Sequence, residues 1–105
     1  MMTNVNVLKT FVAVIDSGSV AAAAHGRGYS PAAVSRQIGW LQRRLGVRLF
    51  VPDGRSIRPT QEALEFADRA RALVVQVSGF ERYSEAFASA AEDRLHRACL
   101  EVVET

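Results

Sequence analysis

Arginine is the residue type that could do most of the chemistry open to this sequence. Twelve of its 13 basic residues are arginines, and a planar guanidinium can bind a phosphate or a guanine edge through two hydrogen bonds. Residues 1–60 hold eight basic and two acidic side chains, whereas residues 61–105 hold five basic and nine acidic ones. The net charge of +2 therefore conceals a positive first half. Charge alone allows either an anionic partner such as nucleic acid or a solvated basic surface.

Residues suited to catalysis or metal binding are few and scattered. Cys99 is the single cysteine, and His25 and His96 are too far apart in sequence to suggest a zinc cluster. No pair of acids or Ser–His arrangement has a recognisable catalytic spacing. Gly26-x-Gly28 lacks the rest of a dinucleotide-binding fingerprint. The sequence therefore predicts neither an enzyme nor a metal or cofactor site.

Membrane insertion and secretion are also not indicated. Charges and glycines interrupt every apolar run before it reaches the roughly 20 residues that a membrane span needs. The first residues, Met1 to Val7, lack the basic and apolar regions of a secretory signal. We therefore expect a cytoplasmic protein without membrane contacts.

Two helices are predicted in the first part of the chain. Apolar residues recur at helical spacing between a cap at Asn4 and a stop at Gly18. Ser19 can cap a second, short helix over Val20–His25, which should end in a tight turn at Gly26.

A third helix is marked at both ends. Ser30 is a suitable N-cap, Pro31 occupies the first helical position, and Gly46 can close the end. One side of this helix is an aliphatic stripe of Val34, Ile38, Leu41 and Leu45, and the opposite side carries Ala32, Arg36, Gly39 and Arg43. A buried stripe opposite a small and cationic face is what a helix needs to enter a DNA major groove.

A hairpin and a long helix are predicted to follow. Two short strands, Leu49–Val51 and Ile57–Arg58, flank a Pro-Asp-Gly turn that places Arg55 at its tip. Thr60 can cap the next helix, in which residues recur with a period of about 3.5, as in a coiled coil. This seam consists of Phe66, Ala70, Leu73, Val77, Phe80, Ser84, Phe87 and Ala91. A helix over Gln61–Ala88 should pair with a second copy, although breaks at Ser78-Gly79 and at Ser89 would divide the helical segment.

These residues resemble the N-terminal DNA-binding domain of LysR-type transcriptional regulators over roughly Leu8 to Leu73. The matching pieces are Leu8-x-x-Phe11, Gly18-Ser19-Val20, Ser30 through Ile38, Leu45-Gly46-x-x-Leu49-Phe50 and Arg55-x-Ile57. The resemblance implies a mainly α fold: a winged helix-turn-helix with a small β-hairpin wing over residues 1–60, and a linker or dimerisation helix with a helical tail over 61–105. It also implies that the helix from Pro31 reads the major groove and that the wing near Arg55 reaches the minor groove or backbone.

The expected function is sequence-specific binding of double-stranded DNA by a homodimer that reads an interrupted palindrome. We expect DNA contacts from Ser30, Pro31, Ala32, Ser35, Arg36, Arg43, Arg55, Ser56 and Arg58. Dimer contacts are expected from Phe66, Ala70, Leu73, Val77, Phe80 and Phe87. The alternative is a short dimerisation module that pairs with a full-length relative and modulates it.

The sequence departs from the family pattern at several positions. Pro31 replaces a frequent glutamine, Pro52 a frequent arginine and Pro59 a frequent leucine. Arg27 stands where a core leucine is usual, and its stem could carry the guanidinium to a DNA phosphate. Family members usually have a longer effector-binding domain, and no small-molecule effector site is recognisable in this chain, which is either a truncation or a naturally short member.

Overall fold

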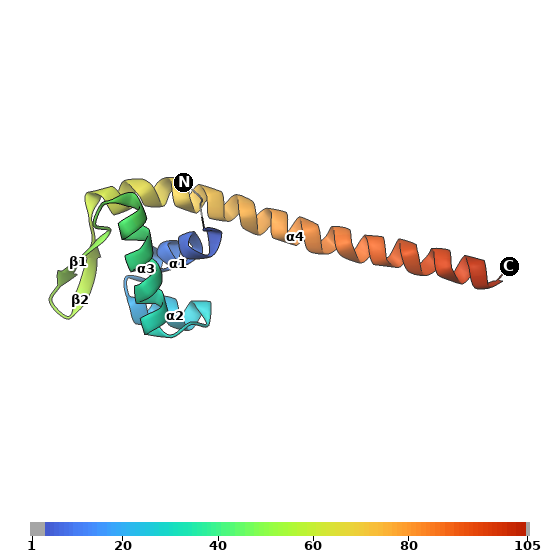
Figure 1. Cartoon of the computed structure of the whole chain (residues 1–105), viewed down its shortest axis with the longest axis horizontal. Helices are drawn as coiled ribbons and strands as arrows, with labels where there is room; N and C mark the ends of the chain where they lie inside the picture. The colour runs from blue at the N-terminus through green and yellow to red at the C-terminus, as the bar shows by residue number, and fades with distance from the viewer. Residues whose placement is uncertain (1–3, 105) are drawn as a thin grey trace. The chain divides into compact units, whose positions relative to one another are not determined.

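The computed structural model describes the backbone of residues 4–104 and the side chains of residues 4–99. Its elements follow the order expected from the sequence (Figure 1): α1 Val5–Ser17, α2 Val20–Arg27, α3 Pro31–Leu45, β1 Phe50–Asp53, β2 Ser56–Pro59 and α4 Gln61–Glu104. The prediction of a mainly helical fold with a hairpin wing and a long last helix is confirmed. Helix α4 is continuous past Gly79, so the break considered there is absent.

The chain consists of two compact units, and the boundary between them falls inside α4, between Val74 and Val75. The first unit therefore extends beyond residue 60, where the sequence suggested a boundary. The reason is packing, because Ala63, Ala67 and Ala70 of α4 are buried in the core of the first unit. No helix in the described part of the chain is both long and apolar enough to cross a membrane.

Side-chain caps define where α1, α2 and α3 begin. The Oδ1 of Asn4 accepts a hydrogen bond from the Val7 N–H at 3.3 Å, and Ser19 and Ser30 cap α2 and α3 in the same way. Helix α2 is longer than expected, since it runs through Gly26 to Arg27 and ends at Gly28, whose φ of 73° suits only glycine readily. The capping pattern read from the sequence therefore located the helix starts more accurately than this helix end.

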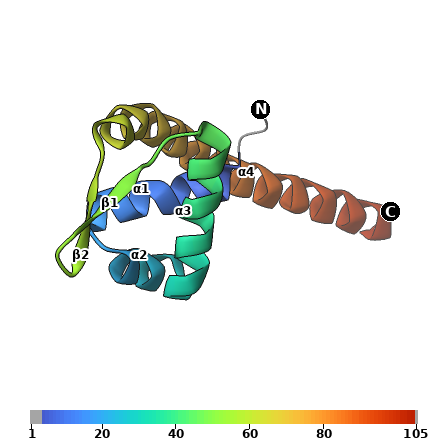
Figure 2. The same cartoon turned by 60° about the vertical axis from the view of Figure 1, so that its left-hand side comes forward.

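The core of the first unit is centred on α1. Figure 2 shows α1 crossing behind α3, with α2 near the lower end of α3. Phe11 of α1 is fully buried, and its ring centroid lies 5.9 Å from that of Phe50 and 5.6 Å from that of Phe66. One aromatic side chain thus joins α1 to the wing and to α4. An ion pair between Arg71 and Asp16 also connects α4 to α1.

The wing is a tighter hairpin than the sequence suggested. Its turn is the two residues Gly54 and Arg55, and Gly54 has a φ of 63°, as a type II′ turn requires at its first central position. Strand β1 consequently includes Pro52, paired with Ile57, and β2 ends at Pro59.

Both prolines fit because hydrogen-bonded and non-hydrogen-bonded pairs alternate in an antiparallel ladder. The Thr60 N–H donates to the Leu49 carbonyl at 2.9 Å, so the neighbouring pair of Phe50 and Pro59 falls at a non-hydrogen-bonded position. Two residues further, Pro52 falls at the same kind of position. Neither missing N–H is therefore needed by the hairpin, and strands at an edge tolerate proline.

Candidate nucleic-acid interface

Helix α3 has the two faces predicted from its sequence. Val34, Ile38 and Leu41 are buried in the core. The predicted DNA contacts in and next to α3 all have exposed side chains: Ser30, Pro31, Ala32, Ser35, Arg36 and Arg43. The structure therefore places two guanidinium groups and several small side chains together on the outer side of one well-anchored helix.

The N-terminus of α3 leaves a backbone donor at the surface. The Ser30 Oγ accepts from the Ala33 N–H at 3.1 Å, and the Val34 N–H donates to the Ser30 carbonyl at 3.1 Å. Pro31 has no N–H, so the first turn retains the N–H of Ala32, which precedes both of these bonded groups. A phosphate oxygen near this end would find a donor and the positive end of the helix dipole.

The wing presents the other predicted contacts. Arg55 occupies the turn, and Ser56 and Arg58 follow on β2, all three with exposed side chains. Between them Ile57 is half-buried and packs against the core. This alternation turns the polar side chains of β2 outward while the strand stays attached to the domain.

A glutamine that the sequence reasoning missed joins α3 to the wing. The Oε1 of Gln42 accepts hydrogen bonds from the backbone N–H groups of Leu49 at 2.8 Å and Phe50 at 3.3 Å. On the far side of the hairpin, the Thr60 Oγ1 donates to the Arg48 carbonyl at 2.7 Å. The sequence signal that could have identified this role is a polar residue in the last turn of α3, just before the chain turns toward β1.

We expect Gln42→Ala to lower the free energy of unfolding by about 1–2 kcal/mol, because two partly buried N–H groups lose their acceptor. Gln42→Glu retains an acceptor at the same place and should keep most of the stability. Urea denaturation of both variants measures the difference. Equal stability of Gln42→Ala and the unsubstituted chain would show that water replaces the side chain without loss.

Arg27 turns toward the protein, which corrects the suggestion that it reaches a phosphate. Its Nε donates to the Thr10 Oγ1 at 3.4 Å and its Nη2 donates to the Asn6 carbonyl at 3.3 Å. Its guanidinium carbon also lies 5.2 Å from the centroid of the Tyr29 ring. Arg27 thereby supplies a hydrogen-bond partner to Thr10, which is fully buried. Where the family pattern has a leucine in apolar contact with the core, this chain has polar contacts.

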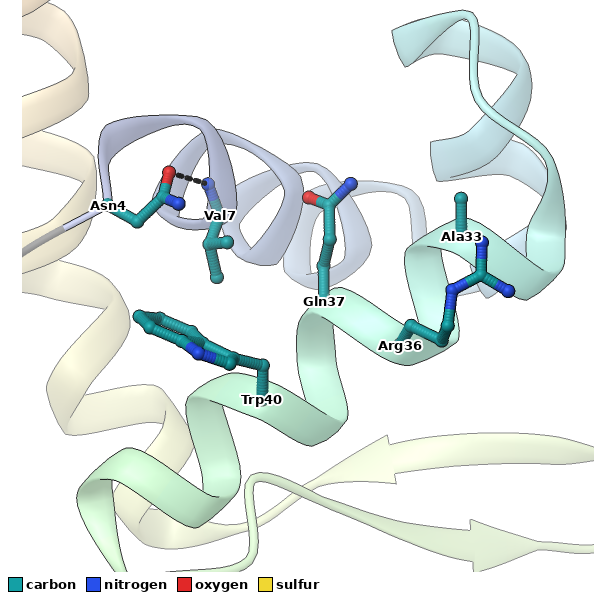
Figure 3. Close-up of a pocket in the computed structure, with 6 residues that line it drawn as sticks. All are labelled: Asn4, Val7, Ala33, Arg36, Gln37 and Trp40. Carbon is teal, nitrogen blue, oxygen red and sulfur yellow. Dashed lines mark hydrogen bonds between the residues drawn. The ribbon is translucent and has the colours of Figure 1, made fainter.

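An open cleft lies between the start of α1 and α3. Figure 3 shows the Trp40 ring below Val7, the Gln37 side chain extending from α3 toward α1, and Arg36 at the end away from Trp40. Asn4 and Ala33 complete the lining. Trp40 is half-buried and packs against the core. The lining contains one basic and no acidic residue, so an anionic backbone running beside α3 would meet no like charge here.

The predicted dimer residues divide into two groups. Ala70 is 4% exposed and Phe66 is half-buried against the core of its own domain. These two side chains are therefore already packed within one chain, which corrects their assignment to a free dimer surface. Leu73, Phe80 and Phe87 are exposed and Val77 is half-buried.

A core of α1, α2 and α3 with an exposed basic helix and an arginine-tipped hairpin defines a winged helix-turn-helix domain. Residues 5–64, more than half of the chain, match the family model of the bacterial regulatory helix-turn-helix proteins of the lysR family. The chain therefore belongs to the LysR family, and its first unit contains the DNA-binding domain of that family.

Individual relatives agree with this assignment. The transcriptional regulator AceR of Acinetobacter baumannii is 33% identical over 95 residues, which cover 90% of this chain and 32% of AceR. The crystal structure of the CbnR DNA-binding domain in complex with DNA has a TM-score of 0.71 and 31% identity, and covers 82% of this chain and 99% of that one. A DNA complex of the BenM DNA-binding domain with catB site 1 gives 0.73 and 29%, covering 83% and 98%. The chain thus spans about a third of the curated regulator.

Proposed function

We propose that this chain binds double-stranded DNA sequence-specifically as a homodimer and thereby regulates transcription in the cytoplasm. The observation that carries the proposal is the exposure of Arg36 and Arg43 on a helix whose opposite face is buried. That arrangement leaves the guanidinium groups available to base edges while the core fixes the orientation of the helix. The solved DNA complexes of CbnR and BenM domains with the same fold support this use of the surface.

Within this proposal the contacts fall into two classes. Arg36, Ser35 and the small residues Pro31 and Ala32 face base edges in the major groove, with Ser30 and the helix end beside a phosphate. The wing residues Arg55, Ser56 and Arg58 bind the backbone or the minor groove. Arg43 lies further along α3, where either a phosphate or a base edge is within reach.

The dimer contact is proposed for one stripe of α4, in which Phe80 and Phe87 are exposed and Val77 and Ser84 are half-buried. The stripe of Val77, Phe80, Ser84 and Phe87 alternates large and small residues. When two copies of α4 lie antiparallel, Phe80 of one copy can face Ser84 of the other, and Val77 can face Phe87. Large side chains then meet smaller ones in each layer, as close packing favours. A two-fold dimer of this kind requires a two-fold symmetric DNA site.

Selection of bound sequences from random DNA tests the whole proposal. We expect enrichment of an interrupted palindrome whose half-sites lie about one helical turn apart, or a multiple of it. Affinity for the selected site should fall with salt, with a slope near −0.9 for each phosphate neutralised. Enrichment of no sequence, together with binding that is insensitive to salt, would refute the proposal.

The second candidate is a dimerisation module that pairs with a full-length relative. The exposed apolar side chains of α4 favour it, because they suit a relative's linker helix as well as a second copy. Purified chain that dimerises but shows no salt-dependent DNA binding would support this candidate over the first.

A further inference from the structure

Helix α3, the recognition helix of the proposed function, carries a glycine in its interior. Gly39 lies in the middle of α3, on the outward line of Ala32, Arg36 and Arg43. Its φ is not positive, so the backbone conformation does not require glycine. Glycine inside a helix costs stability relative to alanine. A residue that weakens the helix at its DNA-facing surface, without a conformational reason, calls for another explanation.

The neighbouring Arg43 provides one. A Cβ added to Gly39 would lie 3.3 Å from the Arg43 Nη1, a tighter contact than most real Cβ atoms make. Arg43 thus folds back along the helix, toward its N-terminus, and one nitrogen of its guanidinium lies beside the position that a side chain at residue 39 would occupy. Long side chains in helices normally lean in this direction. Without a side chain at position 39, the guanidinium can lie against the helix surface.

This placement brings the Arg43 guanidinium to a useful position. Gly39 lines the groove between α3 and the wing together with Ser35, Ile57 and others. Arg36 and Arg43 are seven residues apart, or about 10.5 Å along the axis. At about 3.4 Å per base pair, this separation spans about three neighbouring base pairs.

We propose that Gly39 is a positioning residue for DNA recognition: its missing side chain leaves room for the Arg43 guanidinium beside residue 39, from where the guanidinium contacts a base edge. This inference rests on the proposed function. Gly39 acts through Arg43 and does not itself contribute a side-chain contact.

Gly39→Ala separates positioning from stability because its two effects have opposite signs. The variant should raise the melting temperature by several degrees, since alanine favours the helix. It should lower affinity for the selected site about tenfold, the size expected when one bidentate base contact is lost, and change affinity for random DNA little. Gly26→Ala is the matched control, because Gly26 is also helical and its added Cβ would meet nothing within 4 Å. This control should gain stability with unchanged DNA affinity.

A double-mutant cycle with Arg43→Ala tests the mechanism. If Gly39 acts through Arg43, the alanine at position 39 should have no further effect on specificity once Arg43 is removed. An equal loss in both backgrounds would mean that the new methyl group collides with DNA directly, which overturns the positioning role. Unchanged preference in Gly39→Ala would overturn the inference alone. An unsubstituted chain that prefers no sequence would refute the proposed function, and the inference with it.

Discussion

Replacing both Phe80 and Phe87 by aspartate should convert the proposed homodimer into monomers. These side chains are 67% and 56% exposed within one chain, and burial of each phenylalanine contributes roughly 1.5–3 kcal/mol. A two-fold interface buries two copies of each ring, one from each chain, and would leave the introduced carboxylates without water. Each monomer would then bind one half-site alone, and the loss of bivalency should lower DNA affinity by about 10²–10⁴.

The measurement is the molar mass in solution by analytical ultracentrifugation, followed by DNA titration. Val75→Asp is the matched control, because Val75 is 61% exposed on the same helix but lies outside the repeating seam. It should remain dimeric and bind DNA normally. A double aspartate variant that stays dimeric would exclude this stripe as the interface. A monomeric variant with full affinity would show that dimerisation is not needed for binding.

Arg36→Ala should weaken binding to the selected site by about 1–3 kcal/mol, which is the discrimination expected of a bidentate contact with a base. Folding should be unaffected, since the Arg36 side chain is exposed. Affinity for random DNA should change much less, because phosphate contacts dominate non-specific binding.

Arg44→Ala is the control for charge. Arg44 is another exposed arginine of α3 that is not among the predicted DNA contacts, and its guanidinium carbon lies 5.6 Å from the centroid of the Trp40 ring. It should change the affinities for selected and random DNA by similar small factors. Equal losses on both DNAs in Arg36→Ala would instead assign Arg36 to the phosphate backbone.

Local chemistry explains how much of the fold could be predicted. Ser30, Pro31 and Gly46 define α3 through interactions within a few residues, namely a cap, a preset φ and a left-handed end. The helical period likewise determines which side of α3 is apolar, whatever it packs against. Such signals are complete within a short segment, and for this reason the bounds of α3 and the exposure of its arginines were predicted correctly.

Non-local contacts decided the rest. Gln42 can act as an acceptor only because the chain after α3 brings the Leu49 N–H back to its Oε1. Arg27 turns inward because Thr10 of α1 lies within reach of its guanidinium.

The α4 seam shows the same limit. The repeat predicted that Phe66 and Ala70 contact a partner chain. In the structure, both side chains instead pack against the core of their own chain, and Phe66 contacts Phe11 of α1. A sequence period states which residues share a helix face. Only the tertiary fold determines what covers that face, because the covering surface comes from segments distant in sequence. By itself the sequence therefore determined the helix that faces outward and its charge, whereas the fold decided which of the remaining side chains are free to bind.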